Sequence, residues 1–527
     1  MMILPVSYIK LRPTLLLTVL LAMLALLSHA TGAARVTAAA ENKIDEAVLT
    51  ATAGNAQTEF LIVLREQASL EEAARISDKT ERGRFVYHRL TSVASRSQVL
   101  LRTMLDAYGV EYRAYWVNNM IWARGGRELL FALAARPDVM HIYANTWQRA
   151  DIPTITDSTD TTRAADDLTI EWNIAIVNAP EVWALGYTGQ GAVIGGQDTG
   201  YEWQHEALIG SYRGWDGTNA DHNYNWHDAI HEENPLSSPG NPCGYNAPAP
   251  CDDNNHGTHT MGIMAGQTET EGIGMAPGAK WIGCRNMEGG WGSPATYSEC
   301  FEWFIAPYPI DGDPFTDGDP SKAPHVINNS WACTVSEGCV APDILRSVVE
   351  AVRSAGIVTV QSAGNNGSSC GTVNTPAAIY DASFTVGATD VSDNIAFFSS
   401  RGPVTIDGSN RRKPDIVAPG QGVRSSIPGN SYVELSGTSM AAPHVAGLVA
   451  LLISADPSLA GQIDELEEII TQTAIPRTSS QVCGDDQPDS VPNNVYGWGR
   501  IDALVAFLKA RPPVELFWRF APVVFSE

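Results

Sequence analysis

What this 527-residue chain lacks narrows its function before any motif is considered. Cationic side chains are scarce, because 34 Lys and Arg face 59 Asp and Glu and leave a net charge of −25. This balance argues against nucleic acid and anionic membrane surfaces as main partners. No apolar run reaches the roughly 18 residues of a membrane-spanning helix, and no internal repeat is visible.

The first 30 residues have the features of a secretion signal. Lys10 and Arg12 precede a 13-residue apolar run, Leu15–Leu27, and small residues follow where a signal peptidase would cut. We therefore expect a secreted protein, with an uncleaved anchor as the alternative. Residues 31–57 are rich in Ala, Thr and Glu and are expected to form a flexible spacer.

Cysteine is missing from the first 242 residues and then occurs eight times. An even number in an exported chain favours disulfides. Zinc ligation is the alternative, and the lack of any Cys-x-x-Cys pair gives it little weight. Loop positions suggest four pairs, although eight cysteines allow 105 connectivities: Cys243–Cys251, Cys284–Cys300, Cys333–Cys339 and Cys370–Cys483.

Residues 58–150 differ from the rest in charge and pattern. They carry 13 basic and 10 acidic side chains, whereas everything after residue 150 has a net charge of −29. Strands are expected at 60–64, 112–116, 120–122 and 139–143, and helices within 69–107 and 127–135. This β-α-β-β-α-β order predicts a small α+β, ferredoxin-like unit. Residues 151–169 are expected to be a linker, either a spacer or a region cut during maturation.

From about residue 170 to 510, short apolar strands alternate with helices. Strands are expected at 192–195, 326–327, 356–360, 384–387 and 415–418, and helices at 342–354 and 446–455. The alternation predicts a three-layer α/β domain with a parallel sheet. Polar stretches at 213–255 and 306–324 are expected to be loop insertions, and the tail at 511–527 is left open as a docking strand or a packed end.

Three segments carry side chains suited to nucleophilic catalysis. Asp198 follows an apolar strand, His256 begins a small-residue helix, and Ser439 lies at the start of a long one. The carboxyl end of a strand is where active sites of α/β domains lie, which suits Asp198. The side chain of His256 can exchange protons near neutral pH. The start of a helix, where Ser439 lies, stabilises an oxyanion. A fourth segment, Ser362–Gly367, carries Asn365, whose amide can donate to an oxyanion.

Each segment also has an ordinary structural explanation. Asp, Asn and Gly form turns, and Ser or Thr caps helices. His256 and His259 have the spacing of a metal pair, but no Glu follows His256 as the zincin motif requires. His444 is a second candidate base, which we expect to pack within its helix.

The order of these residues along the chain is informative. Asp, then His, then Ser is the subtilisin order and differs from those of chymotrypsin-like enzymes and α/β-hydrolases. With further motifs at 398–403 and 496–500, residues 170–508 resemble the subtilase family of serine endopeptidases. Residues 58–150 resemble the family's inhibitory propeptide. Stretches at 214–216, 226–229 and 302–307 resemble insertions found in one subgroup.

The resemblance implies a role for each matched residue. Ser439 is the expected nucleophile, His256 the general base and then acid, and Asp198 the group that orients His256. The Asn365 side chain and the Ser439 N–H are expected to form the oxyanion hole.

The resemblance also implies a substrate-binding strand, although specificity stays open. The expected substrate-binding residues are Ser330, Trp331 and Ala332 of this strand, together with Ala363 and Gly364. The family usually has Gly where Ala332 stands, and Pro where Glu206 follows His205.

The expected function is that of a secreted, self-processing serine endopeptidase that forms an acyl-enzyme on proteins or peptides. Its own propeptide is the expected intramolecular inhibitor, and the mature chain is expected to be a monomer. The chemistry needs no cofactor; structural calcium is common in the family and stays open without assigned ligands. The alternatives are a catalytically silent binding protein on the same fold and a metalloprotease using His256 and His259.

Overall fold

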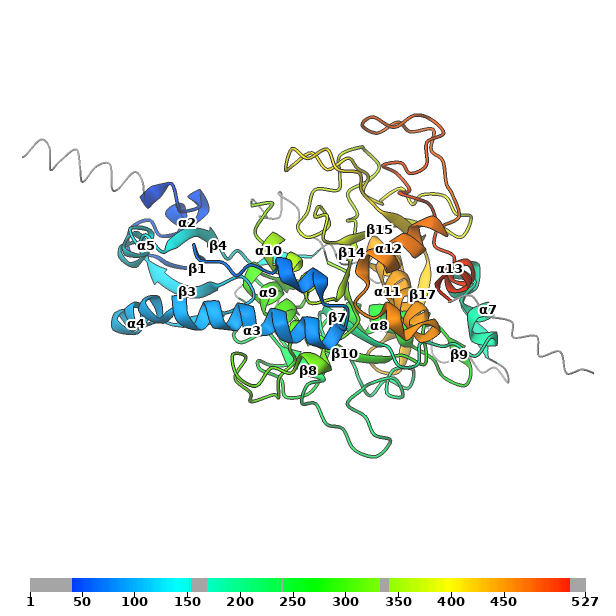
Figure 1. Ribbon diagram of the computed structural model, residues 1–527, viewed down its shortest axis with the longest axis horizontal. Helices are drawn as coiled ribbons and strands as arrows, with labels where there is room; N and C mark the ends of the chain where they lie inside the picture. Colours follow the sequence, from blue (N-terminus) through cyan, green and yellow to red (C-terminus); the bar gives the residue numbers. More distant parts are fainter. Residues whose placement is uncertain are drawn as a thin grey trace, which may run out of the picture. The chain divides into compact units, whose positions relative to one another are not determined.

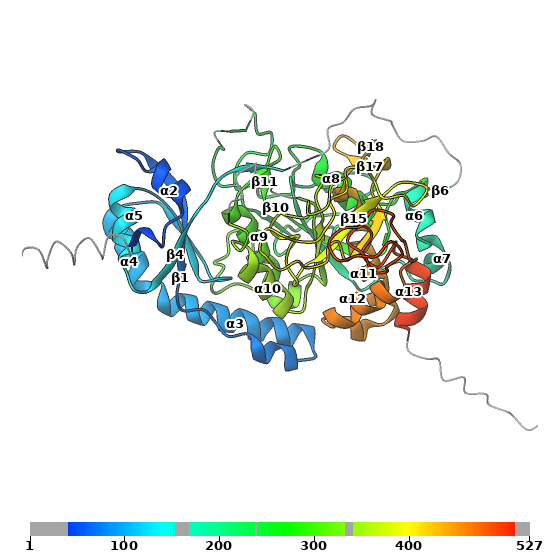
Figure 2. The same cartoon turned by 90° about the horizontal axis from the view of Figure 1, so that it is seen from above.

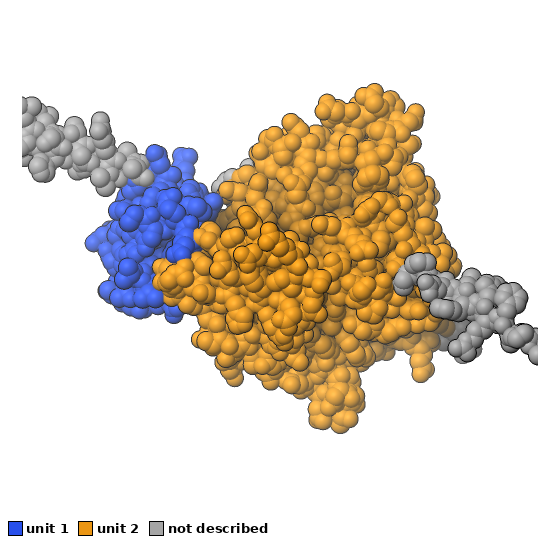
Figure 3. Space-filling view, viewed as in Figure 1, with its two compact units in different colours: residues 1–66, 98–114, 120–144 blue, residues 67–97, 115–119, 145–527 orange. Residues whose placement is uncertain are grey.

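The computed structural model describes residues 40–150, 152, 168–234, 236–237, 240–331 and 341–511. The predicted signal segment, most of the predicted linker, Ala332, Cys333, Cys339 and the tail beyond residue 511 lie outside them. The chain divides into two compact units (Figures 1 and 3). Unit 1 comprises residues 1–66, 98–114 and 120–144, and unit 2 comprises residues 67–97, 115–119 and 145–527.

Unit 1 contains a four-stranded sheet in the order β2-β3-β1-β4, in which β1 pairs antiparallel with β3 and β4. The strands are β1 (Gln57–Leu64), β2 (Tyr112–Tyr115), β3 (Met120–Gly126) and β4 (Val139–Ala144). Helices α4 (Val99–Tyr108) and α5 (Arg127–Ala134) add Leu101 and Leu130 to a core that includes Ile62. The predicted order of strands and helices therefore agrees with the structure.

Part of the predicted spacer is folded, which corrects that prediction for residues 40–51. Helix α2 (Glu46–Ala51) lies here, and Ala40, Ile44 and Val48 join the core of unit 1. Ile44 lies before α2 and forms a β-bridge with Ile142, and Val48 is the buried residue of α2. In an Ala- and Thr-rich segment this short apolar pattern is easily overlooked.

Unit 2 is organised around a seven-stranded sheet in the order β16-β15-β14-β13-β7-β10-β8, in which all neighbours pair in parallel. The predicted parallel sheet is thus confirmed. The strands are β7 (Val193–Asp198), β8 (Trp226–Asp228), β10 (Lys280–Arg285), β13 (Val326–Asn329), β14 (Val358–Ser362), β15 (Phe384–Thr389) and β16 (Ile416–Pro419). Strands β8 and β10 were not predicted. Strand β8 is short, and the apolar pair of β10, Trp281-Ile282, lies between Lys280 and Gly283.

Helices lie on both faces of this sheet and form two separate cores (Figures 1 and 2). One core includes α8 (His256–Ala265), α11 (Thr438–Ala455), α12 (Ile463–Gln472) and α13 (Ala503–Ala510). The other includes α3 (Lys79–Ser97), α9 (Pro294–Ile305) and α10 (Arg346–Ser354). Gly195 in β7 permits close packing, since a Cβ there would lie 2.8 Å from the Phe304 ring of α9.

The remaining described elements of unit 2 are short. They are η1 (Glu71–Arg75), β5 (Gln148–Arg149), β6 (Thr169–Ile170), α6 (Trp172–Ile176), α7 (Ala179–Ala184), β9 (Glu271–Gly272), β11 (Met287–Glu288), β12 (Trp291–Gly292), η2 (Pro320–Lys322), β17 (Val423–Ile427), β18 (Ser431–Leu435) and η4 (Pro457–Leu459). Among the described helices, α11 alone has the length and apolarity of a membrane span, and it is mostly buried as a core helix.

Candidate active site

The predicted catalytic residues meet where the parallel sheet reverses its strand order. The chain runs from β7 through β8 and β10 on one side and then crosses to β13 on the other side of β7. Asp198 is the last residue of β7, and Ser330 follows the last residue of β13. Ligand sites of open α/β sheets lie at such a switch point, beyond the carboxyl ends of the strands.

Asp198 and His256 form a buried pair. His256 Nδ1 lies 2.7 Å from Asp198 Oδ1, and both side chains are almost fully buried. Asp198 Oδ1 also accepts a hydrogen bond from the Thr199 N–H at 2.8 Å. When Nδ1 donates its proton to the carboxylate, Nε2 of a neutral imidazole is a proton acceptor. His256 Nε2 is buried and has no hydrogen-bond partner among the described residues.

Close backbone contact holds this pair together. A Cβ on Gly257 would collide with the Gly200 carbonyl oxygen and would lie 3.1 Å from the Cβ of Asp198. The Gly257 N–H also donates to Thr199 Oγ1 at 3.0 Å. The glycine after His256 therefore lets the start of α8 pack against the end of β7.

Asp252 is a supporting residue that the sequence analysis missed. Its carboxylate accepts from Thr199 Oγ1 at 2.8 Å and from Thr258 Oγ1 at 2.6 Å, and so links the end of β7 to α8. Burial raises its pKa, while these hydrogen bonds lower it. Its place four residues before His256 in a polar loop was the available signal, but Asp is common in such loops.

Ser439 lies in the first turn of α11, which begins at Thr438, eight residues before the predicted start of the long helix. Pro443 lies inside the helix and has no N–H to donate to the Ser439 carbonyl. The Ser330 hydroxyl donates to that carbonyl instead, at 2.8 Å. In return, Ser439 Oγ donates to the Ser330 carbonyl at 3.0 Å.

Asn365 caps the same helix. Its Oδ1 accepts from the N–H and the Oγ1 of Thr438, at 2.8 and 2.9 Å. Because Oδ1 accepts both bonds, the orientation of the amide is fixed. Its donor atom, Nδ2, lies beside the first turn of α11, which carries Ser439. The structure thus brings together Asp198, His256, Ser439 and Asn365, the four residues predicted for catalysis.

The other two histidines considered as candidates serve the core. His444 Nδ1 donates to the Met440 carbonyl at 2.9 Å within α11, and Nε2 lies 2.9 Å from Asn173 Nδ2. His259 Nε2 donates to the Val433 carbonyl at 3.1 Å. Burial lowers the pKa of His444 to about 4 and that of His259 to about 3. Within the described ranges, no group of three or more His, Cys, Asp or Glu side chains is arranged to hold a metal ion.

A segment of the predicted propeptide pairs with the hairpin that follows Asn286, whose N–H donates to the Asp198 carbonyl at 3.0 Å. Strand β5 pairs antiparallel with β12, which joins Gln148 to Gly292 and Arg149 to Trp291. The Ala150 N–H donates to the Gly290 carbonyl at 2.8 Å, and the Ala295 N–H donates to Asn145 Oδ1 at 3.0 Å. The sequence analysis missed the pairing of residues 290–292, although their Gly-rich run, Gly289-Gly290-Trp291-Gly292, was visible.

The predicted substrate-binding residues differ in their surroundings. Trp331 is 1% exposed and stacks on Tyr297 with ring centroids 4.0 Å apart. Its carbonyl accepts from Gln361 Nε2 at 2.6 Å. Ala363 is buried, and Gly364 adopts a positive φ of 97° that favours glycine. Ala332 lies outside the described residues.

Three of the four predicted disulfides are present. They join Cys243 to Cys251, Cys284 to Cys300 and Cys370 to Cys483, with Cα separations of 5.7, 5.7 and 5.4 Å. The first closes the loop that leads to Asp252 and His256. The fourth predicted pair, Cys333–Cys339, falls outside the part of the chain that the structure describes.

Comparison with known proteins agrees with this geometry. Residues 189–499 match the model of the subtilase family, peptidase S8. Bacillopeptidase F of Bacillus subtilis is 34% identical over 498 residues, which cover 88% of this chain and 32% of that relative, so the chain spans about a third of its length. Subtilisin Savinase of Lederbergia lenta is 31% identical over 292 residues, 55% of this chain and 86% of the relative.

The thermostable alkaline protease of Halalkalibacterium halodurans is 30% identical over 308 residues, 58% of this chain and 68% of the relative. The family match covers more than half of the chain. It includes Asp198, His256, Asn365 and Ser439, the residues that the fold assembles at one edge of the sheet. The chain therefore belongs to the subtilase family and carries its serine-peptidase domain.

Proposed function

We propose that this chain is a secreted serine endopeptidase that cuts proteins through an acyl-enzyme. The observation that carries the proposal is the 2.7 Å bond between His256 and Asp198, made next to the helix start that bears Ser439. A buried Nε2 without a partner, as in His256, suits a base that receives a proton only during the reaction.

In this proposal Ser439 Oγ leaves the Ser330 carbonyl, gives its proton to His256 Nε2 and attacks the scissile carbonyl carbon. Asp198 holds the imidazole and stabilises its positive charge. The Asn365 amide and the Ser439 N–H donate to the oxyanion. His256 then protonates the leaving amine, and water releases the acyl group by the same steps in reverse order. No cofactor takes part.

We further propose that residues 58–150 are a ferredoxin-like inhibitory propeptide. The β-α-β-β-α-β order and the sheet order β2-β3-β1-β4 support this fold. The pairing of β5 with β12 supports inhibition, because an extended segment that adds a strand there would compete with a substrate that bound in the same way. A net charge of +3 against an acidic peptidase domain would also speed encounter.

Export and self-processing complete the proposal. The signal-like first 30 residues and the disulfides of unit 2 support an oxidising, extracellular destination. The segment 151–169 joins the proposed propeptide to the peptidase domain and is the proposed region of the maturation cut. A cut there, made by Ser439 of the same chain, would free the amino-terminal fragment.

Hydrolysis of unfolded casein tests the proposed activity. The wild-type chain should hydrolyse casein after processing, and a serine-directed phosphonyl fluoride should stop the reaction while a chelator does not. The matched control is Ser439→Ala, expected to be folded, uncut and inactive. An inactive, correctly matured wild type would favour the silent binding protein instead. Loss of activity with the chelator alone would favour the metalloprotease.

A further inference from the structure

The polar insertion at 306–324 has no part in the proposed chemistry. The hydrogen bonds of its described residues run within the loop, to α9, to residues 213–227 and to residues 79–116; none reaches Asp198, His256 or Ser439. Its bonds to Lys79, Tyr87 and Trp116, all within unit 2, suggest a different role for this insertion.

Two buried aromatic residues of the proposed propeptide bind the middle of the insertion. Tyr87 in α3 donates its hydroxyl to the Pro314 carbonyl at 3.2 Å and accepts from the Gly318 N–H at 3.3 Å. Trp116 Nε1 donates to the same Pro314 carbonyl at 3.0 Å. The two rings meet edge to face with centroids 5.3 Å apart. Polar tips on buried rings give this contact specificity as well as area.

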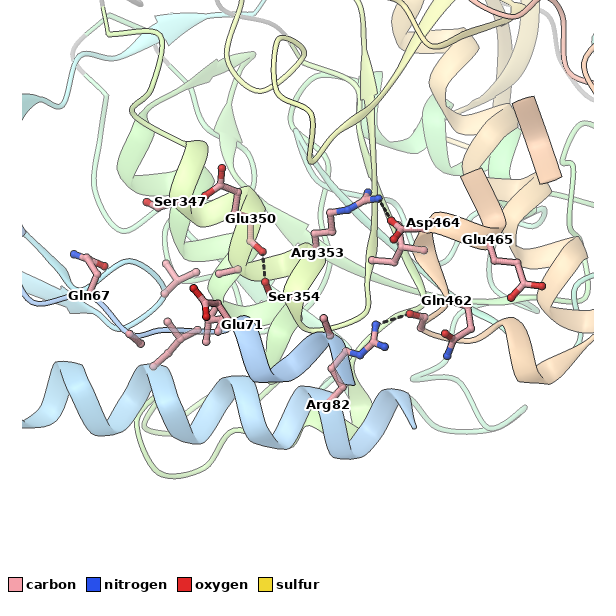
Figure 4. Close-up of a pocket in the computed structure, with 18 residues that line it drawn as sticks. Gln67, Glu71, Arg82, Ser347, Glu350, Arg353, Ser354, Gln462, Asp464 and Glu465 are labelled. Atoms are coloured by element: carbon pink, nitrogen blue, oxygen red, sulfur yellow. Dashed lines mark hydrogen bonds and ion pairs between the residues drawn. The ribbon is translucent and has the colours of Figure 1, made fainter. Parts of the chain in front are cut away.

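The first turn of α3 makes a second set of contacts. Lys79 Nζ donates to the Ala323 carbonyl at 3.2 Å, at the end of the insertion. Arg82 donates to the Gly461 carbonyl at 2.6 Å, and Figure 4 shows its side chain reaching toward the turn before α12. Both side chains donate to backbone carbonyls, so the fold of the backbone, rather than particular side chains, forms the surface that accepts them.

A glycine in the middle of α3 makes the approach close. A Cβ on Gly83 would lie 3.1 Å from the Cβ of Pro320 in the insertion. Glycine weakens a helix interior, so its presence there is explained by the need for this proximity. Lys79, Gly83 and Tyr87 are spaced four residues apart and share one face of α3.

The neighbouring side of α3 is packed less closely. A cavity of about 750 Å³ lies between η1, α10 and the turn before α12 (Figure 4). Carboxylates from both sides line it, including Glu71, Glu350 and Glu465. Arg82 and Arg353 line it as well, and the open space separates its two sides, so the tight contact is the one with the insertion.

We propose that the insertion at 306–324 and the Gly461 turn form a receptor site for residues 79–87 and Trp116, separate from the substrate cleft, and that this site sets how long the amino-terminal fragment stays bound after the chain is cut. The inference rests on the proposed function of residues 58–150 as a propeptide. The receptor site binds the face of α3 that carries Lys79, Gly83 and Tyr87, which are spaced four residues apart.

Gly83→Leu tests the proposal, with Arg84→Leu as the matched control. Leucine favours a helix more than glycine does, so Gly83→Leu strengthens α3 while it blocks the approach to Pro320. Arg84 is the next residue, is largely exposed, and pairs with Glu81 of the same helix. In the full-length Ser439→Ala chain, hydrogen exchange at residues 310–320 should accelerate with Gly83→Leu and stay unchanged with Arg84→Leu.

The active chain supplies the second readout. After processing, Gly83→Leu should shorten the time that the fragment co-elutes with the peptidase by about 10- to 100-fold, the range expected for overpacking a tight contact. Pro320→Gly, which removes the opposing Cβ, should restore part of that time. Equal behaviour of Gly83→Leu and Arg84→Leu in either readout would overturn the receptor site. A wild type without peptidase activity would refute the proposed function alone, because the exchange experiment needs no catalysis.

Discussion

Within unit 2, two of the contacts that residues 67–97, 115–119 and 145–150 make with the peptidase domain differ in kind. Along β12, residues 148–150 are held by main-chain bonds, which any extended peptide can make. At the insertion and the Gly461 turn, the contacts are made by the side chains of Tyr87, Trp116, Lys79 and Arg82. The first contact suits an enzyme that accepts many substrates, and the second suits recognition of one partner.

The largest effect on activity is expected from Ser439→Ala, which abolishes catalysis and leaves both contacts intact. In subtilisin, a relative, loss of this nucleophile lowers turnover about 10⁶-fold. The substituted chain should remain one uncut polypeptide with an unchanged thermal unfolding midpoint. Gel analysis after expression in a protease-free host checks this, and a normally processed Ser439→Ala chain would show that another enzyme makes the cut.

Asn365→Ala is expected to lower kcat about 10²- to 10³-fold, the effect of removing the corresponding donor in subtilisin. The same change removes the Oδ1 that caps α11 through Thr438, so a small loss of stability should accompany it. Steady-state kinetics on a peptide substrate separates the two effects. A KM increase with unchanged kcat would mean that Asn365 binds substrate rather than the oxyanion.

The side-chain contact should depend on pH in a way that the main-chain contact does not. Burial, and then the nearby Arg213, lower the pKa of Lys79 to about 7 against an ordinary 10.5, while Asp78 raises it. At a pH between these two pKa values, Lys79 is neutral in the bound fragment and charged in the free fragment, so binding releases a proton. The fragment should therefore bind more tightly as pH rises, by up to about tenfold per pH unit.

Lys79→Met removes this titrating group and isolates its effect. Fragment retention in the wild type, divided by retention in Lys79→Met, should rise from pH 7 to pH 9. His325 interacts electrostatically with Lys79, but burial lowers its pKa to about 3, so it stays neutral from pH 7 to pH 9. A ratio that does not change with pH would leave Lys79 without a role in release.

The smallest effect is expected from Arg149→Ala. Arg149 is exposed and pairs with Trp291 through the main chain, so the loss of its side chain should change retention less than about twofold, within the usual range for surface substitutions. Size-exclusion chromatography of the processed protein measures this. A large effect would mean that the cleft also recognises side chains, and the contrast between the two contacts would weaken.

The sequence alone was enough to predict the parallel sheet from local patterns, whereas the roles expected for the residues at its edge came from the family resemblance. Short apolar strands mark the sheet, and Asp198, His256 and Ser439 each stand at the end or start of an element. Contacts between distant segments were beyond this reasoning. The pairing of Gln148 with Gly292 and the bond from Tyr87 to Pro314 leave no local pattern in either segment.

Two local misses have identifiable physical causes. The long helix was predicted to start at residue 446, but it begins at Thr438 and includes Pro443, because the Ser330 hydroxyl satisfies the carbonyl that the proline leaves without a donor. Asp252 resembled an ordinary loop residue, because its role depends on Thr199, which lies 53 residues earlier in the sequence. In both cases a side chain from another segment supplied the missing partner.

The central claim is that Ser439, activated by His256 and Asp198, is the nucleophile of this peptidase. Its most direct test is peptide mapping of the processed wild-type chain after inactivation by a serine-directed phosphonyl fluoride. We expect a single adduct, on Ser439, formed in proportion to the loss of casein hydrolysis and absent from His256→Ala. Full casein hydrolysis with Ser439 completely labelled, or an adduct on a different serine that tracks the loss of activity, would contradict the account.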